Sequence, residues 1–149
     1  MTGAVFKRPE SVLVVVHTAG GDVLLLERVR PAGWWQSVTG SLREGESPAE
    51  AARRELAEET GLAAGGLRDL ALQARFPIHP DWRHRYAPEV TENLEHAFAL
   101  ELPGRTRIRL EPGGHRAFAW LPAEDAPVRA TSWTDRQALA RALGLEDPA

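Results

Sequence analysis

Three glutamates that fall within one helical turn carry the clearest chemical signal in this chain of 149 residues. Glu55, Glu58 and Glu59 are spaced i, i+3 and i+4, so on a helix their carboxylates project from one face. Like charges at this spacing repel by roughly 0.2–0.5 kcal/mol per exposed pair. Oxygen ligands gathered without cysteine or paired histidine suit a hard divalent cation, so the pattern predicts a site for Mg²⁺ or Mn²⁺. The alternative is an acidic helix face that is simply solvated.

The helix that positions these carboxylates has clear start and stop signals. Ser47 followed by Pro48 and Glu50 predicts a capping box with proline at the first helical position. Gly61 follows the last turn, where a left-handed residue ends a helix. The predicted apolar face, at helical spacing, consists of Ala49, Ala52 and Leu56.

The same stretch resembles a known family signature. Gly40, five residues, Glu46, seven residues, Arg54-Glu55-Leu56, one residue, Glu58-Glu59, one residue and Gly61-Leu62 match every fixed position of the box of the Nudix hydrolases. The resemblance implies a Mg²⁺-dependent hydrolase of nucleoside-diphosphate-like compounds with an α/β/α sandwich fold. It implies that Glu55 and Glu59 are metal ligands and Glu58 a further one. It also implies that Arg54 holds a glutamate in place and that the Gly40 loop shapes the pyrophosphate site.

Composition limits the other classes of function. The length predicts one domain over residues 1–149, and 43% hydrophobic with 26% charged residues is ordinary for a globular protein. A net charge of −3 gives no general attraction to nucleic acid or to anionic membranes. The absence of cysteine agrees with a cytoplasmic enzyme. The oligomeric state stays open at this point.

Apolar patterning predicts a mixed sheet flanked by helices, that is, an α/β fold. The first two strands, 11–17 and 23–28, should form a hairpin, and the segment 34–39 should feed the box as one strand. Residues 77–90, with three prolines, are expected to form a long loop. The last helix is expected to start at Thr134 and to end at Gly144. The remaining expected strands are 67–76, 91–102, 108–110 and 117–121.

Basic residues outside the box are candidates for phosphate binding. Arg83-His84-Arg85-Tyr86 lies in the long loop, and the planar fork of arginine matches phosphate geometry. Lys7, the only lysine, and Arg28 at a strand end would by themselves be surface charges. For the loop tetrad, phosphate binding and a surface role stay equally open.

A narrower resemblance involves four stretches outside or at the edge of the box: 6–11, 35–41, 83–91 and 132–138. They are similar to the Nudix subfamily that hydrolyses dihydroneopterin triphosphate in bacterial folate synthesis. This resemblance implies that Lys7, Arg28, Thr39 and Ser132 contact substrate, and that Phe76 to His79 lie along the pterin or the phosphates.

One position departs from the pattern of that subfamily. The pattern has Glu-His before a late strand, with the glutamate as a metal ligand, whereas this chain has Gly114 before His115. We expect Glu111 to supply the missing carboxylate through a different loop path, and we expect His115 to contact the substrate.

The resemblance implies hydrolysis of dihydroneopterin triphosphate to the monophosphate and pyrophosphate, with Glu58 as the residue that activates or orients water. One alternative is a Nudix hydrolase of dATP, other nucleoside triphosphates or dinucleoside polyphosphates. A second is a Nudix fold that binds ligands without catalysis, although such modules usually lose box carboxylates and this chain keeps all of them.

Overall fold

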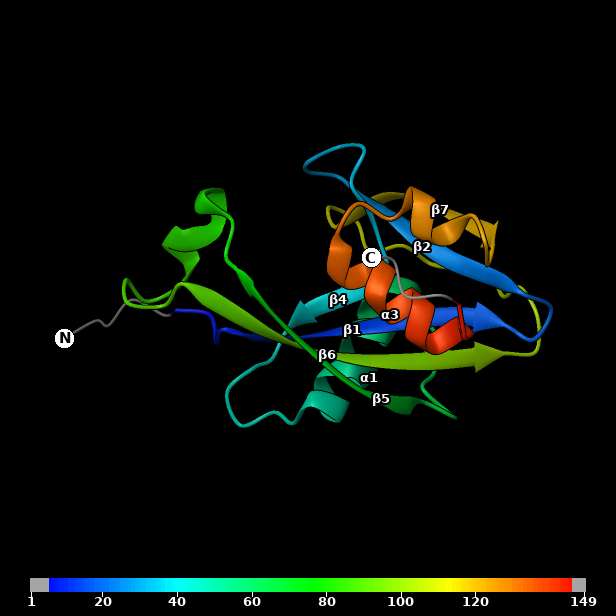
Figure 1. Cartoon of the computed structure of the whole chain (residues 1–149), viewed down its shortest axis with the longest axis horizontal. Coiled ribbons are helices and arrows are strands. Elements are labelled where there is room, and N and C mark those ends of the chain that lie inside the picture. Colours follow the sequence, from blue (N-terminus) through cyan, green and yellow to red (C-terminus); the bar gives the residue numbers. More distant parts are fainter. Residues whose placement is uncertain (1–5, 146–149) are drawn as a thin grey trace.

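The computed structural model describes residues 6–145 and has a mixed sheet at its centre (Figure 1). Strand order along the main path is β3-β2-β1-β6-β5, with β4 paired to β1 and β7 paired to β2. β1 and β6 run parallel, and the other pairs are antiparallel. The strands are β1 (Glu10–Thr18), β2 (Asp22–Arg28), β3 (Trp35–Gln36), β4 (Val38–Ser41), β5 (Arg68–Pro77), β6 (Glu92–Leu102) and β7 (His115–Pro122).

Helices cover both faces of this sheet, which confirms the predicted α/β class. Helix α1 (Pro48–Thr60) packs on the face formed by Val12, Val14 and Val16, while α2 (Ala126–Arg129) and α3 (Trp133–Leu143) pack on the face formed by Leu13 and Val15. β1 is therefore buried on both sides, as its run of β-branched residues predicts. Among residues 6–145, no helix is long and apolar enough to cross a membrane.

Four local predictions need correction. The segment 34–39 forms two strands interrupted at Ser37, because Ser37 bonds to Asp135 of α3 rather than to a neighbouring strand. Residues 108–110 are not a strand. Helix α3 is capped by Ser132, not Thr134. The loop 77–90 contains a short 3₁₀ helix, η1 (Pro80–Arg85).

Helix α1 begins and ends as predicted, with the complete capping box at Ser47 and Glu50 and a left-handed Gly61. The buried apolar residue of this helix that the sequence pattern did not predict is Ala51, whereas Ala49 is only partly buried. η1 lies at the end of the β5–β6 ribbon (Figure 1). The backbone N–H of Lys7 donates to the carbonyl of Arg85 at 2.8 Å, so these two distant segments meet.

Candidate active site

Arg54 is the hub that orders the acidic residues of the box. Its Nε and Nη2 donate to the two carboxylate oxygens of Glu46 at 2.7 and 2.8 Å. Its Nη1 donates to Glu55 at 2.6 Å, and Nη2 also donates to the Ser41 carbonyl at 2.9 Å. The guanidinium thus joins the loop before α1, the end of β4 and the helix itself.

The charged groups in this network shift one another's pKa values. Hydrogen bonds from Arg54 come first among the causes that lower the pKa of Glu46 to about 2. The pKa of Arg54 is raised in turn, with Glu46 the largest cause. Both groups are therefore ionised at neutral pH, and the fork geometry fixes the Arg54 side chain.

Gly40 lies directly against the Glu55 carboxylate. A Cβ placed on Gly40 would overlap the carboxylate carbon and oxygens of Glu55. Gly40 does not have a left-handed backbone conformation. Glycine is required at this position because of the close approach of Glu55. The β4 strand and helix α1 together hold Glu55 in a narrow space.

Glu59 is a buried carboxylate with one unsatisfied oxygen, although a hydrogen bond from the Thr39 backbone acts to lower its pKa. It is 5% exposed, and its Oε1 has no hydrogen-bond partner. Burial is the largest cause that raises its pKa, followed by the adjacent Glu55, with Glu111 also contributing. The Nδ1 atom of His115, itself without a partner, lies 3.9 Å from that oxygen. A buried carboxylate oxygen beside a second carboxylate fits a bound cation, which would remove the repulsion between them.

His115 is neutral in this environment. Burial, followed by the positive charge of Arg28, lowers its pKa to about 4. Its Nε2 lies 3.0 Å from the Gln36 amide nitrogen, so the ring is held between β3 and α1.

Glu58 and Glu111 are less enclosed than the Glu55–Glu59 pair. Glu58 is exposed and lies 3.3 Å from both Arg43 and Arg54. Glu111 is also exposed, but its Oε2 lies 3.9 Å from where a Cβ on Gly114 would be. Within residues 6–145, no three acidic or histidine side chains are already gathered as a metal-binding group. The Glu55–Glu59 pair is thus the part of the predicted ligand set that the fold brings together.

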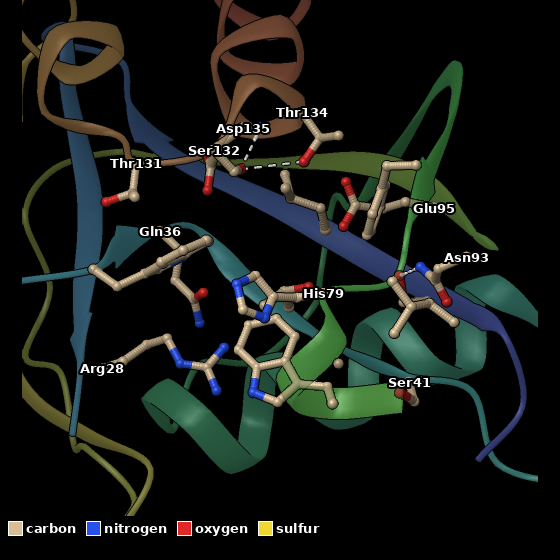
Figure 2. Close-up of a pocket in the computed structure, with 18 of the residues that line it drawn as sticks. Arg28, Gln36, Ser41, His79, Asn93, Glu95, Thr131, Ser132, Thr134 and Asp135 are labelled. Atoms are coloured by element: carbon tan, nitrogen blue, oxygen red, sulfur yellow. Dashed lines mark hydrogen bonds between the residues drawn. The ribbon is translucent and has the colours of Figure 1, made fainter. Parts of the chain in front are cut away.

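A cavity of about 770 Å³ opens beside the box (Figure 2). Its size is sufficient for a heterocycle with a chain of phosphates. Arg83 does not line it, and neither does His84; both are exposed, so the prediction that Arg83 contacts substrate lacks structural support. The predicted substrate-binding residues that do line it are Lys7, Arg28, Thr39, Gly40, Phe76, His79, Arg85, His115 and Ser132.

Three cations gather at one part of this cavity. Burial is the largest cause that lowers the pKa of both Lys7 and Arg28, and the charge of Arg85 comes next for each. The Arg28 guanidinium also lies over the ring of Trp82, 5.0 Å from its centroid. Repelling cations on the wall of one cavity favour an anionic ligand such as a polyphosphate.

The sequence analysis missed the polar residues on another wall of the cavity. Asn93 and Glu95 of β6 and Asp135 of α3 are all buried and line it. Ser37 donates to Asp135 from its backbone N–H at 2.8 Å and from its hydroxyl at 2.7 Å. The alternation of side chains along β6 could have indicated the two strand residues. Asn93 and Glu95 stand at alternate positions, on the face that also carries buried Ala97.

Comparisons with known proteins agree with this geometry. A model of the NUDIX domain matches residues 7–142. The chain is 41% identical over 144 residues to dihydroneopterin triphosphate diphosphatase of Escherichia coli strain K12, covering 93% of this chain and 95% of the relative. The Haemophilus influenzae protein of the same name is 34% identical over 143 residues, covering 93% and 89% of the two chains.

A solved structure supports the same assignment. The E. coli dihydroneopterin triphosphate pyrophosphohydrolase superposes with a TM-score of 0.84 at 40% identity, covering 93% of this chain and 97% of that one. Both the family model and the relatives span nearly the whole chain, and the box carboxylates are all present. The chain therefore belongs to the NUDIX family and is a hydrolase of that family.

Proposed function

We propose that this enzyme hydrolyses dihydroneopterin triphosphate to dihydroneopterin monophosphate and pyrophosphate, with Mg²⁺ as cofactor and Mn²⁺ as its substitute. The observation that carries the proposal is a single cavity whose wall holds Lys7, Arg28 and Arg85 and which adjoins the box at Gly40. The substrate named for the relatives from E. coli and H. influenzae has both a heterocycle and phosphates, and the cavity is large enough for such a molecule.

Glu55 and Glu59 would hold the metal ion, since they are adjacent and Glu59 has an unpartnered oxygen. Glu111 is our proposed third ligand, because its carboxylate lies close to the position of a side chain on residue 114. Glu58 would be a further ligand or would orient water. A bound Mg²⁺ supplies neutralisation of the phosphate charge as the phosphoanhydride bond breaks.

The chain's own residues would divide the remaining work. Lys7, Arg28 and Arg85 bind the phosphates, and arginine can do so through paired hydrogen bonds. Arg54 keeps Glu55 oriented through its 2.6 Å hydrogen bond. Glu58, the most exposed carboxylate of the three on the α1 face, orients or deprotonates the attacking water.

Residues 1–149 would form one catalytic domain that acts in the cytoplasm on a small molecule, within folate synthesis. Neither nucleic acid nor a membrane is a proposed partner, which agrees with the net charge of −3.

Release of pyrophosphate from dihydroneopterin triphosphate and from dATP, each with Mg²⁺ and with EDTA, tests the proposal. We expect Mg²⁺-dependent release with a higher kcat/KM for the pterin compound. Faster turnover of dATP would replace the proposed substrate with a nucleotide. If neither compound releases pyrophosphate, the proposed activity is overturned. In the same assay, Glu111→Gln should raise the Mg²⁺ concentration needed for half-maximal rate, and an unchanged requirement would remove Glu111 from the ligand set.

A further inference from the structure

Glu95 is a buried carboxylate that the proposed hydrolytic steps do not use. It lies on β6, is 7% exposed and lines the cavity. Figure 2 shows its carboxylate pointing into the cavity, on the wall that also carries Asn93 and Thr134. Burying a carboxylate is unfavourable unless donors satisfy it, so this position needs an explanation.

The protein itself supplies few hydrogen-bond donors to the Glu95 carboxylate. Burial, and then the negative charge of Asp135, raise the pKa of Glu95 to about 7, while a hydrogen bond from Thr134 acts in the opposite direction. Asp135 is committed elsewhere, because Ser37 donates to both of its oxygens. Glu95 therefore retains capacity to accept hydrogen bonds from a ligand in the cavity.

Asn93 lies on the same face of β6, two residues before Glu95. Its Nδ2 donates to the Ser11 hydroxyl at 2.7 Å, which orients the amide. Its Oδ1 is buried and has no partner. Glu95 is therefore the acceptor that this wall offers to the cavity, beside an amide whose orientation is fixed, and a ligand that fits it must carry N–H or O–H donors.

Strand register places Glu95 at a suitable distance from the box. Glu95 pairs with Ser11 of β1, and Ser11 pairs with Ser41 of β4, beside Gly40. Adjacent strands lie about 4.8 Å apart, so Glu95 is about 10 Å from the β4 end of the cavity. That span matches a heterocycle at one end and phosphates at the other.

We propose that the Glu95 carboxylate binds the heterocycle of the substrate, accepting hydrogen bonds from a ring N–H and the neighbouring exocyclic amino group. This pair of parallel donors occurs on the 2-amino-4-oxo edge of a pterin, and two carboxylate oxygens match it. The inference rests on the proposed function for the orientation of the substrate, since the phosphates must lie at the box.

The test is equilibrium binding in EDTA, where no hydrolysis takes place. The probes are neopterin triphosphate, followed by its fluorescence, and inorganic tripolyphosphate, which lacks the heterocycle. Wild type, Glu95→Gln and the control Glu101→Gln are compared at about pH 7.5, where most of Glu95 is ionised and most of the probe still carries its ring N–H. Glu101 lies on the same strand but is exposed and outside the cavity.

We expect Glu95→Gln to weaken binding of neopterin triphosphate by about 10- to 100-fold, since paired donors lose one acceptor and meet an N–H instead. Affinity for tripolyphosphate should not change, and Glu101→Gln should resemble wild type with both probes.

Equal affinity of Glu95→Gln and wild type for neopterin triphosphate would overturn the inference. A parallel loss of affinity for tripolyphosphate would also overturn it, because it would mean a general structural role for Glu95. Because binding in EDTA needs no turnover, failure of the proposed hydrolysis is scored separately, by the pyrophosphate assay.

Discussion

Arg54 and Glu46 are joined by two parallel hydrogen bonds of 2.7 and 2.8 Å, while the same guanidinium reaches Glu55 and the Ser41 carbonyl. One side chain therefore ties the loop that enters α1 to a carboxylate proposed to bind metal. The order of the box depends on a planar group with several donors, which lysine cannot replace.

Arg54→Lys should lower turnover more than tenfold and the free energy of unfolding by about 1–3 kcal/mol, because the charge stays but the fork is lost. Arg53→Lys is the matched control, since Arg53 is the exposed neighbour in the same helix. Urea unfolding and steady-state kinetics measure the two effects. Turnover equal to that of the control would refute the role given to Arg54.

Glu46 should contribute to stability in a pH-dependent way. Its pKa of about 2 in the folded protein lies below the ordinary value of 4.5, so its contribution is present above pH 4.5 and is lost as pH falls toward 2. Allowing for solvent screening, Glu46→Gln should cost about 1–2 kcal/mol near pH 7 and less near pH 3. Urea unfolding at both pH values checks this, and a constant difference would contradict it.

Gly40→Ala should reduce activity strongly, because the added methyl group overlaps the Glu55 carboxylate and must displace it. We expect a loss of turnover of at least about tenfold, because a misplacement of about 1 Å at a catalytic group can cost about 100-fold in rate. Gly65→Ala is the control, since a Cβ there meets no atom within 4 Å. If both variants keep wild-type turnover, the close contact has no functional consequence.

Glu59→Gln should abolish Mg²⁺-dependent turnover while the fold stays intact. The pKa of Glu59 is raised above its ordinary value, so ionising it costs stability as pH rises through the folded-state value. In EDTA at about pH 8 the variant should therefore unfold at a higher temperature than wild type. Glu44→Gln, an exposed change just before the helix, should alter neither property. Near-native turnover of Glu59→Gln would remove this residue from the proposed metal site.

Glu95 should make the free protein less stable as pH rises. Its pKa of about 7 exceeds the ordinary 4.5, so between these values the folded state binds more protons than the unfolded state. The contribution to the free energy of unfolding should fall by about 3 kcal/mol across that window, and Glu95→Gln should abolish that fall. Urea unfolding in EDTA at about pH 5 and pH 8 measures it; the same pH dependence in both proteins would be the contrary result.

Local signals in the sequence determined helix α1 almost completely. A capping box at Ser47, a left-handed Gly61 and the i, i+3, i+4 spacing of three glutamates act within a few residues, so no distant contact is needed to predict them. The run of β-branched residues in β1 likewise predicted a strand buried on both faces. The predicted strand at 108–110 failed because a short apolar run alone does not supply a pairing partner.

Only the tertiary structure decided which polar residues share the cavity. Glu95, Asn93 and Asp135 come from a strand and a helix far apart in sequence, and strand register with α3 packing brings them together. The same holds for Lys7 and Arg85, which meet through a backbone hydrogen bond. It also holds for Arg83, which does not line this cavity although it lies two residues from Arg85. Spacing along the chain predicts what lies on one face of one element, whereas the meeting of two elements depends on pairing and packing across the whole core.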